Sequence, residues 1–290
     1  MKVGGQAVIE GVMMKSGAIW SVAVRDPRGV IHVKRERLSP IPKALKLPLL
    51  RGVLALWQAL SLGVKALDYS ASKAYDEEDA KPVSPLEMYA AVGFAVVLGA
   101  GLFLFLPLYA TKLLGIPFPA ITLSGILFNL VEGLVRVIVF IAYLYLISLW
   151  GDIKRLFEYH GAEHKVIFAH EAGSDMMPDS IRKFGTLHPR CGTSFIVMVM
   201  VVSIIVFSLV PGSWSFPLKF ASRLVLIPFV AGLSYEILRF SATRTSNPIV
   251  RMLIKPGLML QRITTRQPDD AQVEVALSAL KAVLAEGGWR

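Results

Sequence analysis

The sequence predicts an all-α integral membrane bundle of about four transmembrane helices, with a small N-terminal β-hairpin and a cytoplasmic C-terminal helix. The composition is 54% hydrophobic, and the mean hydropathy is +0.57. Most of this apolar character lies in four stretches, each close to or above the roughly 20 residues that a helix needs to cross the hydrocarbon core. The stretches are 88–111, 121–151, 191–218 and 220–238.

The distribution of basic residues gives the orientation of these spans. Lys and Arg number 13 before the first span, 6 in the 151–190 loop and 8 from Arg239 onward, whereas the two remaining connections hold one each. We therefore expect a multi-pass protein of the bacterial inner membrane with both termini and the central loop, 151–193, in the cytoplasm. The net charge of +10 then matches anionic lipid headgroups. We expect the lipid bilayer as a partner, and no nucleic acid.

Charged residues inside the spans are rare, which makes each one a candidate for function. Glu132 and Arg136 are four residues apart, so on a helix they share a face and would neutralise each other. A structural ion pair facing the bundle is nearly as strong an interpretation as a functional one. Arg223 is near the outer end of its span and is expected to extend to the interface.

The N-terminal segment, 1–43, is predicted to be cytoplasmic and to contain a β-hairpin at 18–38. Two β-prone runs flank Asp26-Pro27-Arg28-Gly29, which suits a tight turn. The preceding GGQAVIEGVMM has an unusual composition for a strand. One hypothesis makes it a flexible segment folded over the functional site, with Glu10 as a further ligand.

Residues 44–67 are predicted to form an amphipathic helix that is interfacial or re-entrant. Their uncharged core has 13 residues, which is short for a span. A fifth transmembrane helix here would place the two termini on opposite sides of the membrane. A polar linker, 68–87, leads into the four-span domain, 88–240. The tail, 241–290, is predicted to contain an amphipathic helix that begins near Asp269 or Asp270.

The segment HGAEHKVIFAHE, 160–171, concentrates titratable side chains in the central loop. His160, Glu163 and His164 have the H-x-x-E-H spacing of the inverzincin zinc hydrolases. Two histidines four residues apart on a helix can bind one metal ion, and Glu163 is then placed to act as general base. Gly161 weakens this interpretation, because an internal glycine destabilises a helix by about 1 kcal/mol.

A second cluster, LHPRCGTSF, supplies His188 and Cys191, both good zinc ligands. Glu236, at the cytoplasmic end of the fourth span, could supply the distant glutamate of the inverzincin pattern. Three histidines and one cysteine would close a structural zinc site, whereas a missing ligand would leave a position for catalysis. Cys191 could instead be a nucleophile beside His188. His170 and Glu171 are expected to be solvated or to support the ligands.

The chain resembles the YqhQ-like family of bacterial membrane proteins, a family of unknown function. The resemblance covers nearly the whole length and is carried by GGQAVIEGVMM, YHGAEHKVI, HPRCGTSF and the tail ITTRQPDDAQVEVA. The family is usually labelled a predicted metal-dependent enzyme. The resemblance therefore implies metal ligation by His160 and His164, and it brings no substrate with it.

Three functions are compatible with these residues. The first is a zinc-dependent hydrolase at the cytoplasmic membrane face, acting on a lipid or a membrane protein, with Glu163 as base. The second is a non-enzymatic assembly or quality-control scaffold in which a structural zinc fixes the central loop. The third is a transporter that uses Glu132 and Arg136. It would be favoured by broken-helix symmetry between two halves, and none is visible.

Overall fold

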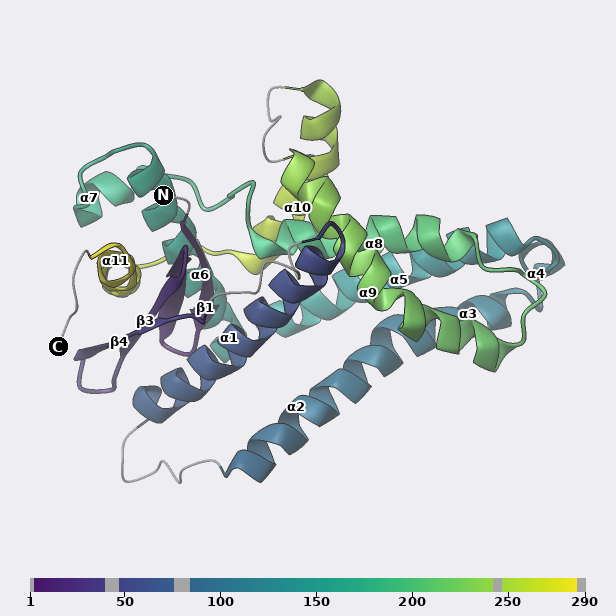
Figure 1. Cartoon of the computed structure of the whole chain (residues 1–290), viewed down its shortest axis with the longest axis horizontal. Coiled ribbons are helices and arrows are strands. Elements are labelled where there is room, and N and C mark those ends of the chain that lie inside the picture. The colour runs from purple at the N-terminus through teal and green to yellow at the C-terminus, as the bar shows by residue number, and fades with distance from the viewer. Residues whose placement is uncertain (1–2, 40–46, 76–83, 242–246, 286–290) are drawn as a thin grey trace.

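A computed structural model of the chain describes residues 3–39, 47–75, 84–241 and 247–285. The fold is mostly helical, with one small sheet near the N-terminus. Long helices lie beside one another at one end of the molecule, and the sheet with its covering helices lies at the other (Figure 1). The first described strand and the last described helix both belong to the sheet end.

The sheet has four antiparallel strands in the order β1-β2-β3-β4. The predicted hairpin is present as β3 and β4, with Gly29 N–H donating to Asp26 O at its turn (2.9 Å). This hairpin belongs to a larger sheet than expected, and the hypothesis that GGQAVIEGVMM is a flexible segment was wrong, because it forms β1 and β2. The strands are Val3–Val8, Gly11–Ser16, Ile19–Arg25 and Ile31–Arg37.

Helices cover both faces of the sheet, and this explains why its inner strands lack polar alternation. Helix α1 (Leu50–Ala74) packs on one face, where Leu62 and Ala66 meet Trp20. Helices α6 (Gly151–Glu171) and α11 (Asp270–Leu284) pack on the other face. Successive residues of β2 and β3 therefore alternate between two apolar cores.

The helical bundle contains the apolar stretches of the sequence. The chain crosses from the sheet end to the far end and back twice (Figure 1). The first crossing consists of α2 (Pro85–Ala100), a π-helical segment η2 (Gly101–Phe105) and α3 (Leu106–Leu114). The other crossings are single helices: α5 (Gly125–Ser148), α8 (Gly192–Ser208) and α9 (Phe216–Ser241). A short helix, α4 (Pro119–Leu123), precedes α5.

Four described helices are long and apolar enough to span a membrane: Leu50–Ala74, Tyr89–Leu114, α5 and α9. The third predicted span is a shorter helix, because α8 ends at Ser208 and residues 209–215 lie outside any helix. The helix expected at 44–67 occupies 50–74 instead and takes up part of the proposed polar linker. The rest of that linker, 76–83, lies outside the described residues, and Ser84 caps α2.

The C-terminal part contains one predicted helix and one that the sequence analysis missed. Helix α11 begins as predicted, with a capping box between Asp269 and Gln272. Helix α10 (Pro248–Thr264) precedes it and runs across the direction of the bundle, at its sheet end (Figure 1). A helical turn, α7 (Pro178–Ile181), interrupts the 172–191 connection.

Candidate functional site

Helix α6 presents the two histidines of the H-x-x-E-H motif on one face, as the sequence analysis expected. It is a helix separate from α5, because the chain breaks at Leu149 and Trp150 before α6 begins. The ring centroids of His160 and His164 are 4.4 Å apart. One continuous helix of 21 residues therefore brings the motif to the junction of the sheet and the bundle.

Gly161 stabilises this arrangement. A Cβ built at Gly161 would collide with the carbonyl oxygen of Arg266, in the segment between α10 and α11. The N–H of Arg266 donates to Phe157 O (2.9 Å), so that segment is fixed against α6. The absence of a side chain at Gly161 allows the close contact.

We expect Gly161→Ala to destabilise the protein by about 1–3 kcal/mol, because the new methyl group must displace a hydrogen-bonded backbone. Gly151→Ala is the matched control: it is in the same helix, and a Cβ there meets nothing within 4 Å. Thermal unfolding in detergent should show a lower Tm only for Gly161→Ala. Equal melting temperatures for the two variants would contradict the close contact.

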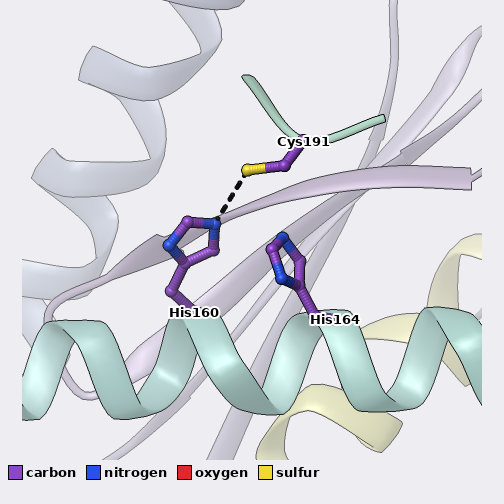
Figure 2. Close-up of side chains that lie close together, drawn as sticks. All are labelled: His160, His164 and Cys191. Carbon is purple, nitrogen blue, oxygen red and sulfur yellow. Dashed lines mark hydrogen bonds between the residues drawn. The ribbon is translucent and has the colours of Figure 1, made fainter. Parts of the chain in front are cut away.

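Cys191 lies opposite the two histidines and forms the N-cap of α8. Its Sγ is 3.1 Å from His160 Nε2, and it also accepts from the hydroxyl of Thr193 (3.3 Å). One ligand atom from each of His160, His164 and Cys191 lies within 4.8 Å of the others (Figure 2). Within the described residues, this is the one group of three or more His, Cys, Asp or Glu with such geometry.

Backbone carbonyls fix the orientation of both imidazole rings. His160 Nδ1 is 2.8 Å from Thr264 O, and His164 Nδ1 is hydrogen-bonded to Thr186 O. If Nδ1 carries the proton in each neutral ring, Nε2 has the ring's lone pair, and that of His160 faces Cys191 Sγ. The Nε2 of His164 is buried and has no hydrogen-bond partner. This pattern is typical of histidines that bind metals.

Glu163 lies beside the cluster and beneath strand β1. Its Oε2 is 3.9 Å from His160 Nε2 and 4.0 Å from His164 Nε2. Burial raises the pKa of Glu163 to about 7, while the charge of His160 and the N–H of Gly5 act in the opposite direction. A side chain at Gly5 would overlap Glu163, so the unusual glycine of the N-terminal segment leaves room for this carboxylate.

His188 is buried near the cluster but stays outside it. Its ring centroid is 5.6 Å from that of His164, and it packs on Phe168. Burial lowers its pKa to about 4, with His164 adding to the effect. The Nε2 of His188 is 3.6 Å from Glu171, which pairs with Arg190.

The other sequence-derived ligand candidates also have different partners. The carboxylate of Glu236 pairs with the guanidinium of Arg51 at the start of α1. Glu10 pairs with Arg155 and accepts from the hydroxyl of Tyr159 (3.1 Å). His170 is partly exposed at the end of α6 and does not belong to the metal-ligand group.

Sequence reasoning missed the residues that hold the cluster in place. Lys165 is buried, and its amine donates to Arg182 O (2.8 Å) and Phe184 O (2.7 Å), which holds the loop that leads to Thr186. Gln261 of α10 exchanges two hydrogen bonds with the backbone of His188. The signal for Lys165 was its place directly before the apolar residues 166–169 of α6, since a lysine is rarely buried without partners.

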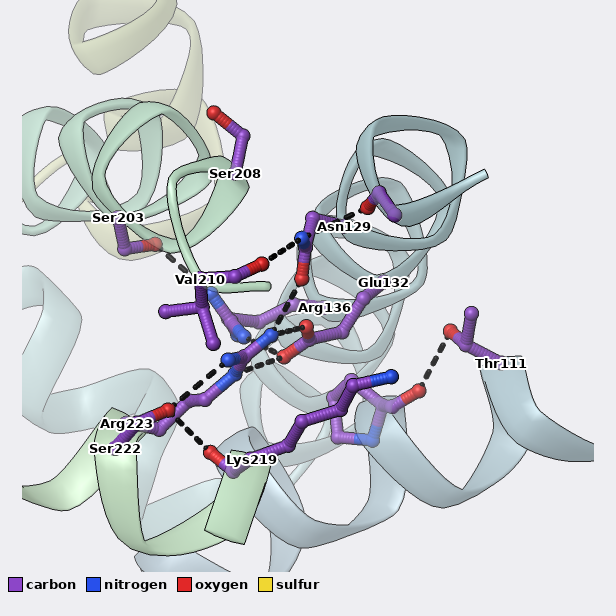
Figure 3. A network of polar contacts seen from close by, with 12 residues as sticks. Thr111, Asn129, Glu132, Arg136, Ser203, Ser208, Val210, Lys219, Ser222 and Arg223 are labelled. Atoms are coloured by element: carbon purple, nitrogen blue, oxygen red, sulfur yellow. Dashed lines mark hydrogen bonds and ion pairs between the residues drawn. The ribbon is translucent and has the colours of Figure 1, made fainter. Parts of the chain in front are cut away.

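A polar network in the bundle contains the other charged candidates (Figure 3). The expected pair of Glu132 and Arg136 is present. Arg223 also binds Glu132, with Nη2 2.5 Å from Oε2, and donates to Asn129 Oδ1 (2.6 Å). The expectation that Arg223 extends to the interface was wrong: its side chain is 0% exposed, because the carboxylate it needs is inside the bundle.

The comparisons with known proteins agree with the resemblance noted in the sequence. Residues 47–286 match the family described as "Protein of unknown function (DUF1385)". The chain is 35% identical to "Uncharacterized protein YqhQ" of Bacillus subtilis (strain 168), over 97% of this chain and 92% of that protein. No solved structure matches the chain significantly. The chain therefore belongs to the DUF1385 family of proteins of unknown function.

Proposed function

We propose that the protein is a zinc-dependent hydrolase at the cytoplasmic face of the membrane. The observation that carries this proposal is a set of three converging metal-ligand atoms with a carboxylate about 4 Å from two of them. Catalytic zinc sites keep three protein ligands and one open position, whereas structural sites use four. His188 would be the fourth ligand of a closed site, and its ring packs on Phe168 instead.

The residues present fit zinc in chemistry and in orientation. Zinc prefers histidine nitrogen and cysteine sulfur, which are the donors of His160, His164 and Cys191. Both rings are held through Nδ1 by backbone carbonyls, so Nε2 is the atom of each ring that can bind a metal. The buried Nε2 of His164 gains a partner when a metal binds.

The roles of the residues follow from this placement. Bound zinc supplies Lewis acidity and lowers the pKa of water. Glu163 acts as general base: it takes a proton from the attacking water and returns it to the leaving group. The hydroxyl of that water stays on the other fragment, so the bond is cleaved without a further reactant. The N–H of Gly5 and the burial under β1 hold the carboxylate in position.

The placement in the membrane rests on charge and on packing. We propose that the spans are 89–114, α5, α8 and α9, with both termini in the cytoplasm of a bacterium. In the sequence, 27 of the 31 basic residues lie in the segments 1–87, 151–190 and 239–290, which are outside the proposed spans apart from the last turn of α9. Helix α1 packs along the sheet with its second half, which favours an interfacial position for it over a fifth span.

The location of the cluster favours a substrate that is itself in the membrane. Cys191 is the N-cap of α8, and Arg266 donates to Ser148 O at the end of α5 (3.1 Å). The metal-ligand atoms therefore lie where two proposed spans end. A lipid, or the membrane-embedded part of a protein, can reach this position from the bilayer, which is the expected partner of the apolar helices.

Metal analysis tests the proposal. We expect the protein purified without chelator to contain one zinc per chain, with an X-ray absorption spectrum that shows nitrogen, sulfur and oxygen ligands. Cys191→Ser and His164→Ala should lose the metal. His170→Ala is the matched control in the same helix and should retain it. Zinc absent from the unmodified protein would contradict the proposal.

The second candidate is a non-enzymatic scaffold with a structural zinc. It is favoured by the burial of the cluster and by the number of segments that it joins: α6, the N-terminus of α8, and the backbone at Thr186 and Thr264. A spectrum with three nitrogens, one sulfur and no oxygen would support the scaffold over the hydrolase. Loss of zinc would then unfold the junction between the sheet and the bundle.

A further inference from the structure

The bundle contains an apolar cavity that is partly open at its surface and that the proposed mechanism does not use. Its volume is about 430 Å³. It is lined by residues of the proposed spans, from α2, η2, α5, α8 and α9, and by Leu56 of α1. Its walls are almost entirely aliphatic and aromatic, with glycine and alanine at Gly99, Ala100 and Ala231. This size and lining are typical of sites for small apolar ligands.

The two polar side chains of the wall are already engaged. Arg136 donates to Ser203 Oγ (2.9 Å) and to Phe103 O (3.0 Å), and it forms an ion pair with Glu132. Ser203 in turn donates to Met200 O (2.8 Å). A polar headgroup would therefore find no free partner inside the cavity, whereas an aliphatic chain needs none.

The α8 wall of the cavity begins one helical turn after Cys191, one of the proposed zinc ligands. Phe195, Val199, Ser203 and Phe207 line it at intervals of four residues, which places them along one side of α8. Cys191 is one interval earlier on the same side, as the N-cap. With a rise of about 1.5 Å per residue, the cysteine is about 6 Å along the axis from the nearest wall residue.

We propose that the cavity binds a single aliphatic chain of a lipid, with the headgroup of that lipid turned toward Cys191. The binding site for this aliphatic chain, called the chain site below, is inferred from the cavity alone. The further step, that this lipid is the substrate, rests on the proposed function. A chain held along α8 would place the bond nearest its headgroup beside Glu163 and the three zinc ligands.

The chain site is tested by photocrosslinking in nanodiscs. The probe is a lysophosphatidylglycerol that carries a diazirine in its acyl chain, and the crosslinked residues are mapped by mass spectrometry. We expect crosslinks to the cavity wall, such as Val199 and Met200. Crosslinks confined to bilayer-exposed positions such as Val97 would overturn the proposal.

Two glycines of α2 provide matched variants. A Cβ at Gly99 or at Gly93 meets nothing within 4 Å, but only Gly99 lines the cavity. Gly99→Leu should fill the space that the chain occupies and lower crosslinking to the wall by about tenfold or more, since two displaced methylene groups already correspond to about that factor. Gly93→Leu should leave it unchanged. Equal crosslinking in both variants would overturn the site.

A second probe, with the diazirine next to the headgroup, tests the orientation. Crosslinks to Thr193 are expected. Crosslinks near Leu224, a wall residue that follows Arg223 of the charged network, would overturn the orientation. Both measurements record binding without turnover. Wall crosslinks in a protein that releases no product would support the chain site and contradict the hydrolase. Turnover without wall crosslinks would support the hydrolase and contradict the chain site.

Discussion

Glu163→Gln is expected to abolish product formation while zinc stays bound. The glutamine has the same shape and can still accept from the N–H of Gly5, so the packing under β1 is preserved. It cannot take a proton, however, and loss of a general base lowers turnover by about 10²- to 10⁴-fold. The measurement uses protein in nanodiscs with a bacterial lipid extract, with products followed by mass spectrometry and zinc determined in the same sample.

Glu158→Gln provides the control for this prediction. Glu158 is in the same helix, and its carboxylate accepts from Gln272 of α11 (3.0 Å), away from the three ligand atoms. Its turnover should match that of the unmodified protein. Unchanged turnover in Glu163→Gln would show that Glu163 is not a general base, and it would contradict the proposed hydrolase. Loss of zinc in this variant would show instead that Glu163 helps to bind the metal.

The local part of the site could be predicted from the sequence. The spacing of His160 and His164 fixes their relation on a helix, and Cys191 precedes an uncharged apolar run, so both groups could be placed at the edge of the membrane. The capping box at Asp269 was visible for the same reason, since it depends only on residues three apart. Patterns of this kind depend only on residues within one or two helical turns of each other.

The rest depends on contacts between distant segments. The spacing of His188 and Cys191 suggested that both bind one metal, but the ring of His188 turns toward Phe168. Glu236 was placed at the correct end of its span, yet its partner, Arg51, is 185 residues away in the sequence. The burial of Glu163 beneath the backbone at Gly5 could not be predicted, because it depends on the packing of β1 against α6.

The sheet illustrates the same limit. Strand β2 is buried on both faces, so it shows neither the polar alternation of an exposed strand nor the length of a span. Helix α10 is amphipathic, so its periodicity was present in the sequence, but Pro256 stands inside it and a proline usually ends a predicted helix. For the sheet, the deciding partners are other elements of the fold, which local periodicity does not contain.

The charged network of the bundle gives the largest expected effect on stability. Glu132→Gln is expected to destabilise the protein by about 3–5 kcal/mol, because it leaves the guanidinium groups of Arg136 and Arg223 buried without a counter-charge. Glu132 is 1% exposed and accepts from both arginines. Thermal unfolding in detergent measures the loss. Asp270→Asn, which removes an exposed partner of Arg182, is the control and should cost at most about 1 kcal/mol.

A triple replacement separates a structural network from a functional one. Leucine at Glu132, Arg136 and Arg223 together removes all three charges, and buried ionic groups replaced by apolar side chains often keep their stability. We expect this variant to recover most of the melting temperature that Glu132→Gln loses, and to retain zinc. Recovery of stability with full turnover would assign the network to packing alone. Recovery of stability without turnover would mean that these charges act in the function, since the fold no longer needs them.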